Sequence, residues 1–186
     1  MLNLIFDTET TGFPHSKRPV DAIEQPYLVQ LAVLITKGDE IIRSWDCIVK
    51  CPIHIPEDAM KVHGITTEIM QEKGVNPTEV IETFHKDLLI ADRVICHNAD
   101  FDLKIMSYAY HRAGKDFTHL KEMARVCTMK TAAPSQRLLG KRKSLSECYE
   151  VLVDSAGFSD AHTASADTMA CWKVFRELER RGVELK

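Results

Sequence analysis

The sequence predicts an α/β protein, in which a mixed β-sheet is flanked by helices. Strand candidates come first along the chain, at Met1–Asp7, Tyr27–Thr36 and Glu40–Val49. A further short strand and several helical patterns alternate after them, which is typical of parallel strands joined by helices. The 186 residues, of which 45% are hydrophobic, suit one compact domain that spans residues 1–186 around a single core.

The N-terminal elements predict an antiparallel hairpin beside the first strand. Met1–Asp7 is a short apolar run that ends in an acid, and Phe13–Pro26, with its prolines and mixed charges, is expected to be a surface loop. Tyr27–Thr36 is a long run rich in Val, Leu and Ile, and Glu40–Val49 is another strand candidate. Between these two runs, Lys37-Gly38-Asp39 has the composition of a hairpin turn.

The rest of the chain alternates helices with one short strand. Pro77–Ala91 carries apolar side chains at helical spacing, and Val94–Cys96 is a short apolar strand. Helices are also predicted at Asp102–Arg112, Ser144–Val153 and Ala164–Arg181. The parallel strands would lie beside the hairpin, which makes the predicted sheet mixed.

Composition excludes some classes of protein and leaves the ligand open. No apolar run reaches the roughly 18 residues that a membrane span needs, and no basic start marks a signal peptide, so we expect a cytoplasmic protein without a membrane partner. The six cysteines form no C-x-x-C pair and no cluster at zinc spacing, which predicts reduced thiols. The net charge of −3 does not indicate nucleic acid by itself, but a protein that holds phosphate through bound metal ions needs local acid rather than global base.

The first acidic site is Asp7-Thr8-Glu9. On a strand, residues i and i+2 point to the same face. Asp7 and Glu9 would therefore present two carboxylates side by side, and such carboxylates repel unless a cation or a proton lies between them. For this pair taken alone, the alternative is a strand that simply ends in two solvated acids.

Two later segments carry acids at places where α/β proteins bind ligands. Cys96–Asp102 follows a short strand and precedes a helix. There Asn98 could act only as a helix N-cap, and Asp102 only as a favourable charge in the first helical turn. The third segment places His162 five residues before Asp167. Five residues along a helix turn through about 140°, so His162 and Asp167 would not share a helix face. They can converge only if His162 lies in the loop before the helix. The alternative is that His162 is a surface histidine.

Together these segments resemble the DnaQ-like 3′–5′ exonucleases of the DEDD superfamily, in the branch with a histidine base. That family carries D-x-E on its first strand, H-N-x-x-F-D at a later strand-to-helix junction and H-x-x-x-x-D near its last helix. The chain has these motifs in the same order, at Asp7–Glu9, His97–Asp102 and His162–Asp167, and Val62–Thr66 is similar to the family's V-H-G-I-T. The likeness covers nearly the whole chain and is nearest to the epsilon proofreading subunit of bacterial DNA polymerase III, to which Gly140–Leu145 is also similar.

The resemblance implies an RNase H-like fold, with a five-stranded mixed sheet flanked by helices, and hydrolysis of phosphodiester bonds from a 3′ end. It implies two divalent cations, Mg²⁺ or Mn²⁺, which suits hard oxygen ligands without a Cys/His cage. Asp7 would bridge both ions, Glu9 and Asp167 would complete the site that holds the attacking water, and Asp102 would hold the second ion. His162 would take the proton from that water as general base, a step suited to an imidazole.

Contacts with the substrate are expected from residues near these motifs. The resemblance and the chemistry of base stacking indicate the following side chains: Thr8, Thr10, Asp58, His63, Asn98, Phe101 and His162. A core position is the alternative for Phe101, and the basic stretch of Arg137 and Lys141–Lys143 is expected to be a solvated face that could also follow a phosphate backbone. The loop Phe13–Pro26 is longer than the family usually has, so contacts near the end of the bound strand could differ.

The expected partner is the 3′ end of a nucleic acid, DNA rather than RNA and single-stranded or frayed, with a DNA polymerase as a further partner. Two other functions stay open. One is the same chemistry on RNA, as in the RNA-trimming exonuclease RNase T. The other is a non-catalytic module that binds nucleic acid or docks on a polymerase, although clustered carboxylates without metal would repel phosphate there.

Overall fold

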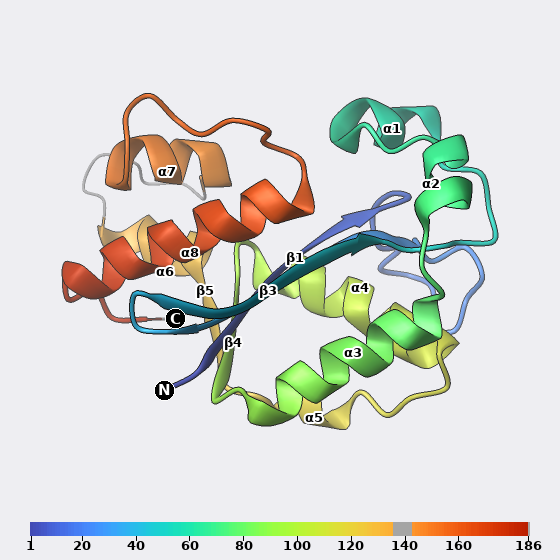
Figure 1. Cartoon of the computed structure of the whole chain (residues 1–186), viewed down its shortest axis with the longest axis horizontal. Helices are drawn as coiled ribbons and strands as arrows, with labels where there is room; N and C mark the ends of the chain where they lie inside the picture. The colour runs from blue at the N-terminus through green and yellow to red at the C-terminus, as the bar shows by residue number, and fades with distance from the viewer. Residues whose placement is uncertain (136–142, 186) are drawn as a thin grey trace.

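The computed structural model of the protein describes residues 1–135 and 143–185 (Figure 1). Its centre is a five-stranded sheet in the order β3-β2-β1-β4-β5. The strands are β1 Asn3–Thr10, β2 Leu28–Lys37, β3 Glu40–Ile48, β4 Arg93–Cys96 and β5 Arg125–Cys127. Strand β1 pairs with β2 antiparallel and with β4 parallel, and β5 continues the parallel part, so the predicted mixed five-stranded sheet is confirmed.

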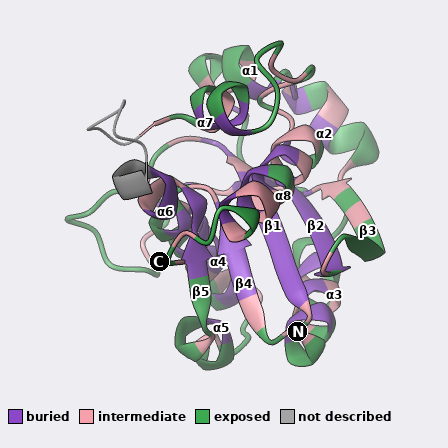
Figure 2. Cartoon of the chain, turned by 90° about the vertical axis from the view of Figure 1, so that its left-hand side faces the viewer, coloured by how far each residue is buried: buried purple, intermediate pink, exposed green. Residues whose placement is uncertain are grey.

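Strands β2 and β3 form the predicted antiparallel hairpin. Gly38 in the turn has a φ of 61°, a left-handed conformation that is strained for most residues with a Cβ. The outer strand β3 is mostly exposed, whereas β1, β2 and β4 run through the buried centre of the molecule (Figure 2). The hairpin therefore forms one edge of the sheet and leaves β1 at its middle.

Helices cover both faces of this sheet. They are α1 Glu57–His63, α2 Thr67–Lys73, α3 Pro77–Ile90, α4 Ala99–Arg112, α5 Thr118–Glu122, α6 Thr128–Ser135, α7 Leu145–Leu152 and α8 Ala164–Arg180. Helices α3, α4 and α5 lie on one face, and α6, α7 and α8 lie on the other (Figure 1). Helices α1 and α2 lie beside the carboxyl end of β1 (Figure 1).

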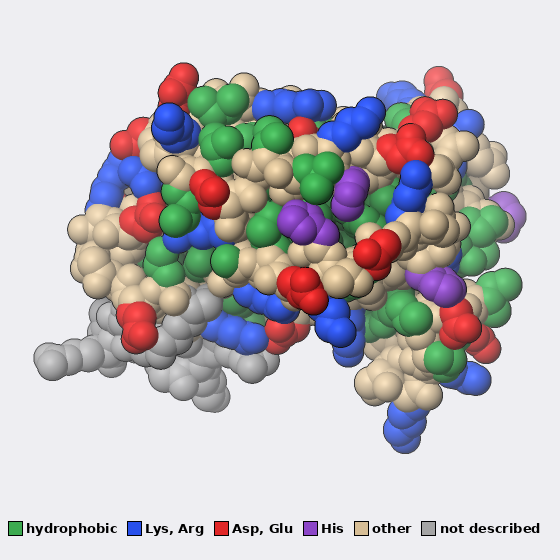
Figure 3. Space-filling model, turned by 90° about the horizontal axis from the view of Figure 1, so that it is seen from below, with side chains coloured by type: hydrophobic (Ala, Val, Ile, Leu, Met, Phe, Trp, Pro, Cys, Tyr) green, Lys and Arg blue, Asp and Glu red, His purple; other side chains and the backbone are tan. Residues whose placement is uncertain are grey.

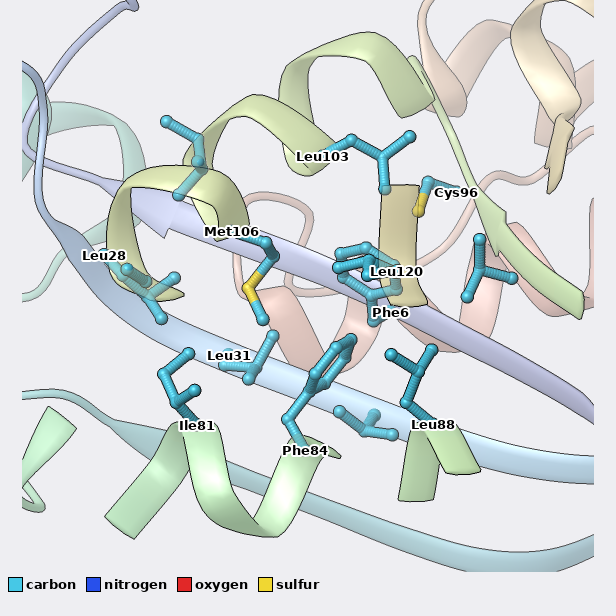
Figure 4. Packing of buried hydrophobic residues seen from close by; sticks show 14 of the residues in the cluster. Phe6, Leu28, Leu31, Ile81, Phe84, Leu88, Cys96, Leu103, Met106 and Leu120 are labelled. Atoms are coloured by element: carbon cyan, nitrogen blue, oxygen red, sulfur yellow. The ribbon is translucent and has the colours of Figure 1, made fainter. Parts of the chain in front are cut away.

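Alternation along β1 distributes its apolar side chains between two cores. Phe6 packs with Phe84 of α3 and Met106 of α4, and the two phenyl rings meet edge to face with centroids 5.2 Å apart (Figure 4). Ile5 points to the opposite face and packs in one cluster with Phe175 of α8. The strand is thus clamped between α4 and α8, and any side chain further along β1 faces one of these two helices.

Two side chains give the loop of residues 13–26 a defined shape. Gln25 is 2% exposed. Its carboxamide accepts a hydrogen bond from the N–H of His15 and donates to three carbonyl groups of residues 15–19, at 3.0–3.2 Å. Arg112 of α4 donates to the carbonyls of Gln25 and of the residue after it. The loop that the sequence predicts is therefore ordered by its own hydrogen bonds and joined to α4 by Arg112.

The sequence did not predict α1, α2, α5, α6 and β5, all of which are short. Strand β5 has three residues and is held by the pairing of Val126 with Ile95, so no local period marks it. Strand β1 continues past its predicted end to Thr10 because β2 pairs with its polar end, and α4 begins at Ala99 rather than at Asp102. No helix within the described ranges is long and apolar enough to cross a membrane.

Candidate active site

Strand β1 presents two carboxylates toward helix α8. Ile5 packs with α8, and alternation along the strand places Asp7 and Glu9 on the same face. Asp167 lies in the first turn of α8. One carboxylate oxygen from each of these three acids lies within 4.8 Å of the other two. The acids of the first and last motifs therefore meet at the carboxyl end of β1.

The other face of β1 holds the fourth acid. Asp102, in the first turn of α4, is 2% exposed, and Thr8 Oγ1 donates a hydrogen bond to its Oδ1 at 2.8 Å. Burial raises the pKa of Asp102 to about 7, against the lowering effect of this hydrogen bond. Thr8, which the sequence indicated as a substrate contact, thus orients Asp102.

The clustered acids bind protons more tightly than isolated ones. Burial, followed by the negative charges of Asp102, Asp167 and Glu9, raises the pKa of Asp7 well above its usual range. Burial and the charges of Asp167 and Asp102 raise the pKa of Glu9 to about 8. Burial also raises the pKa of Asp167, although the N–H and the ring of His162 oppose it. A cation would relieve this repulsion, and a donor set of carboxylate oxygens fits a hard divalent ion such as Mg²⁺ or Mn²⁺.

His162 lies in the loop before α8, as convergence with Asp167 requires. Its N–H donates to both oxygens of Asp167, at 3.3 and 3.4 Å, and its side chain is exposed. His162 has a φ of 70° and Asp160 a φ of 59°, which is uncommon for residues other than glycine. Thr163 caps α8 by accepting a hydrogen bond from the N–H of Ala166. Backbone strain of this kind often marks a functional loop, and here it places an accessible imidazole beside the acids.

A cavity of about 510 Å³ adjoins the acids and collects several predicted substrate contacts. Thr10, Asp58, His63 and Phe101 border it together with Glu9. Its wall also includes the carboxyl end of β1 and helix α1, which the sequence did not predict. Residues as far apart in the sequence as Glu9 and Phe101 thus surround one space next to the carboxylates.

Two aromatic rings form one wall of this cavity. Phe101 is half-buried: it packs against the core, which was the alternative to its predicted role, and it also lines the cavity. Its ring meets that of Phe13 edge to face, with centroids 6.1 Å apart, and Phe13 is 83% exposed. Sequence reasoning missed Phe13 because it assigned the whole segment to a surface loop. The position of an aromatic residue directly after Thr-Thr-Gly was the available signal.

His63 borders the cavity with a buried ring. It is 7% exposed, and its Nδ1 accepts a hydrogen bond from the N–H of Ile65 at 3.1 Å. Burial lowers the pKa of His63, and a hydrogen bond with the backbone of Thr10 opposes that lowering. Its Nε2 is itself buried, so the ring shapes the wall of the cavity between α1 and the end of β1.

The remaining predicted residues lie elsewhere or outside the described part of the chain. Asn98 is at the N-cap position of α4 with a φ of 67°, its side chain makes no capping hydrogen bond, and it does not line the cavity. Arg137 and Lys141–Arg142 fall outside the described residues. Lys143 forms an ion pair with Glu147, and the carbonyl oxygen of Lys143 accepts a hydrogen bond from Nε2 of His97.

Known proteins resemble this chain over most of its length. A family model described as "Exonuclease" matches residues 4–175. The 3′-5′ exonuclease DinG of Staphylococcus haemolyticus is 22% identical over 181 residues, which cover 97% of this chain and 19% of that protein. DNA polymerase III subunit epsilon of Rickettsia typhi is 28% identical over 181 residues, which cover 92% of this chain and 71% of that protein. The chain therefore spans only about a fifth of the first of these relatives.

Solved structures show the same architecture. E. coli Exonuclease I, in complex with a dA16 oligonucleotide, superposes with a TM-score of 0.78 at 18% identity, over 97% of this chain and 41% of that one. At this identity the likeness concerns the fold. It confirms the predicted RNase H-like arrangement of a mixed five-stranded sheet flanked by helices.

Proposed function

The chain belongs to the exonuclease family, and we propose that it is itself a metal-dependent enzyme that hydrolyses nucleic acid from the 3′ end. One observation carries the proposal: carboxylates from β1 and α8 converge within 4.8 Å, with a fourth buried beside them on α4. Mutual repulsion within the cluster raises the pKa values of Asp7 and Glu9 and destabilises the site when it is empty. Bound cations would remove this repulsion, which gives a physical reason for the acids to lie so close together.

Asp7, Glu9 and Asp167 would hold a divalent cation, and Asp102 would contribute to holding a second. Bound Mg²⁺ or Mn²⁺ supplies Lewis acidity, which stabilises the charge that develops on the phosphoryl oxygens. Thr8 keeps the Asp102 carboxylate aimed at the end of β1 through its 2.8 Å hydrogen bond. The chain's own contribution is therefore a rigid set of oxygen donors, fixed by a central strand and two helix starts.

His162 is the proposed general base. Its ring is exposed at the rim of the acid cluster, and the left-handed backbone of the loop holds it there. In its neutral form the imidazole would take a proton from the attacking water. The interaction of its N–H with Asp167 couples the loop to the carboxylate that it serves.

The cavity beside the acids is the proposed site of the 3′-terminal nucleotide. Phe101 and Phe13 provide aromatic surface for a base, and aromatic stacking tolerates any base. His63, whose ring borders the same cavity, would pack against that nucleotide. DNA is the favoured substrate because the polymerase-subunit relatives and the oligonucleotide complex of Exonuclease I concern DNA. A polymerase partner for this chain rests on the epsilon relatives alone.

The proposal is tested with single-stranded DNA, duplex DNA and RNA that carry a label at the 5′ end. We expect a ladder of 5′-labelled products that shorten from the 3′ end in Mg²⁺ or Mn²⁺, and no products in EDTA. Full activity in EDTA would exclude metal dependence. Binding without cleavage in either metal would indicate a non-catalytic module, and cleavage of RNA alone would assign the chemistry to RNA.

A further inference from the structure

A second cavity lies on the outer side of α4, away from the pocket for the terminal nucleotide. It has a volume of about 470 Å³ and lies between α4, α5 and the start of β5. Leu103 and Phe117 give it an apolar floor, and Lys104, Lys121 and Arg125 give it a basic rim. We call this space the α4–α5 groove. Seen from below, the molecule carries Lys and Arg side chains interspersed with Asp and Glu (Figure 3).

The cations of the groove lack acidic partners. Lys104, Lys121 and Arg125 are exposed, and none of them forms an ion pair within 4.0 Å in the described part of the chain. The guanidinium of Arg125 donates to the carbonyl oxygen of Lys121 at 2.7 Å, which keeps two positive side chains at the same end of α5. In a chain whose net charge is −3, a group of like charges that repel one another favours an anionic occupant.

The groove begins at the catalytic edge of the sheet. Asp100 lines it and lies two residues before Asp102, and its carboxylate pairs with Lys130 at 2.7 Å. From Asp100 the lining runs along α4 through Lys104 to Ser107, which lies seven residues further and roughly 10 Å along the helix. Residues two apart on a helix point to different sides, so this face of α4 lies away from Asp102, and an elongated anion held at the carboxylates would pass around the start of α4 to reach the groove.

We propose that the α4–α5 groove binds backbone phosphates of the nucleic-acid strand upstream of its 3′ end. This proposal deepens the proposed function and rests on it for the position of the 3′ end. Regularly spaced phosphates match a row of Lys and Arg, and the apolar floor at Leu103 and Phe117 suits the sugars between them. The ligand chemistry is a polynucleotide backbone, so DNA and RNA are two sources of the same occupant.

Binding can be measured separately from catalysis. We would determine the affinity of the full chain for fluorescent single-stranded 12-mers of DNA and of RNA in EDTA, over a range of salt concentrations. The test protein carries Lys104→Gln and Lys121→Gln. The matched control carries Lys37→Gln, at the end of β2, and Lys86→Gln, on α3. It removes the same number of exposed charges as the test protein.

For the groove variant we expect affinity to fall about tenfold at low salt. The slope of log K against log salt should become shallower by about 1.4, since each phosphate contact with a single strand contributes about 0.7. The control pair should behave like the unmodified chain. An affinity and a slope indistinguishable from those of the control would overturn the proposal, and a loss with only one of the two 12-mers would restrict the occupant to DNA or to RNA.

A second readout separates this proposal from the proposed function. The p-nitrophenyl ester of thymidine 5′-monophosphate presents one nucleotide and cannot reach the groove. Its hydrolysis in Mg²⁺ should be the same in the groove variant and in the unmodified chain. If the unmodified chain does not hydrolyse this ester or any 12-mer, the proposed function fails while the binding data still decide the groove. If the groove variant loses ester hydrolysis, the two lysines act on the acid cluster and the proposal fails.

Discussion

At the scale of single residues, Asp7 is the acid whose pKa is raised by the largest number of neighbouring carboxylates. Three other carboxylates raise its pKa, and it lies at the middle strand of the sheet. Its side chain belongs to none of the hydrophobic clusters among the described residues. Removal of this carboxylate should therefore affect the chemistry more than the fold.

We expect Asp7→Ala to abolish hydrolysis while the protein folds normally. Without metal, the variant should resist urea at pH 8 better than the unmodified chain, since one repelling charge is gone. Turnover with labelled DNA and urea denaturation in EDTA measure the two effects. Asp21→Ala, an exposed acid in the loop of residues 13–26, is the control for loss of charge. Near-normal turnover of Asp7→Ala would remove Asp7 from the metal site.

His162 permits a test that separates its ring from its backbone. Loss of a general base typically costs about 10²–10⁴-fold in turnover, which is the loss expected for both His162→Ala and His162→Asn. Asparagine tolerates the left-handed conformation that His162 adopts, so His162→Asn preserves the loop. Full turnover of His162→Asn would show that only the loop geometry matters.

At the scale of elements, the loop of residues 13–26 depends on the buried carboxamide of Gln25. That side chain bonds four backbone groups of the loop, and Arg112 fastens the loop to α4. The same loop begins at Phe13, whose ring meets that of Phe101 edge to face in one wall of the cavity. The loop therefore links a structural anchor to the wall of the proposed substrate pocket.

Gln25→Ala should destabilise the protein by about 1–3 kcal/mol, since it leaves buried backbone groups without partners. It should also raise KM several-fold with little change in kcat, because Phe13 would lose its support while the carboxylates stay in place. Thermal unfolding and steady-state kinetics on a DNA 12-mer measure these effects. Gln71→Ala, at an exposed position of α2, serves as the control. An unchanged KM in a destabilised Gln25→Ala protein would separate the loop from substrate binding.

At the scale of the whole molecule, the acid cluster couples stability to pH and to metal. The pKa of Glu9 rises from an ordinary value of 4.5 to about 8 in the folded chain, and those of Asp7, Asp102 and Asp167 rise as well. Between these limits the folded state binds more protons than the unfolded state. Stability without metal is therefore greatest below about pH 4 with respect to these groups, and it falls as pH rises toward 8.

We expect the urea midpoint in EDTA to decrease between pH 5 and pH 8, with a smaller decrease in Asp7→Ala. Added Mg²⁺ should raise the midpoint at pH 8 more than at pH 5, since protons compete with the metal for the same oxygens. Urea titrations at the two pH values, with and without Mg²⁺, provide the measurement. A midpoint in EDTA that rises between pH 5 and pH 8 would contradict the raised pKa values.

Local patterns of the sequence were sufficient for much of the fold. A period of two along β1 and the composition around Gly38 determine strand and turn, because these features depend on neighbours only a few residues away. The same reasoning placed His162 in a loop and Asp167 inside a helix. It also determined that Asp7 and Glu9 share a face. The family itself followed from three short motifs in order.

Only the tertiary structure decided how these parts meet. The approach of Asp167 to Asp7 and Glu9 depends on which face of the sheet α8 covers, and the contact of Thr8 with Asp102 joins positions 94 residues apart. Short elements such as α1 and β5 carry too few residues for a period and are held by their neighbours. Phe13 lies in the wall of the cavity because Gln25 and its hydrogen-bond partners shape the loop of residues 13–26. The sequence of that loop indicates only that it forms neither a helix nor a strand. Burial, convergence and the pKa values that follow from them depend on contacts distant in sequence, which no local pattern contains.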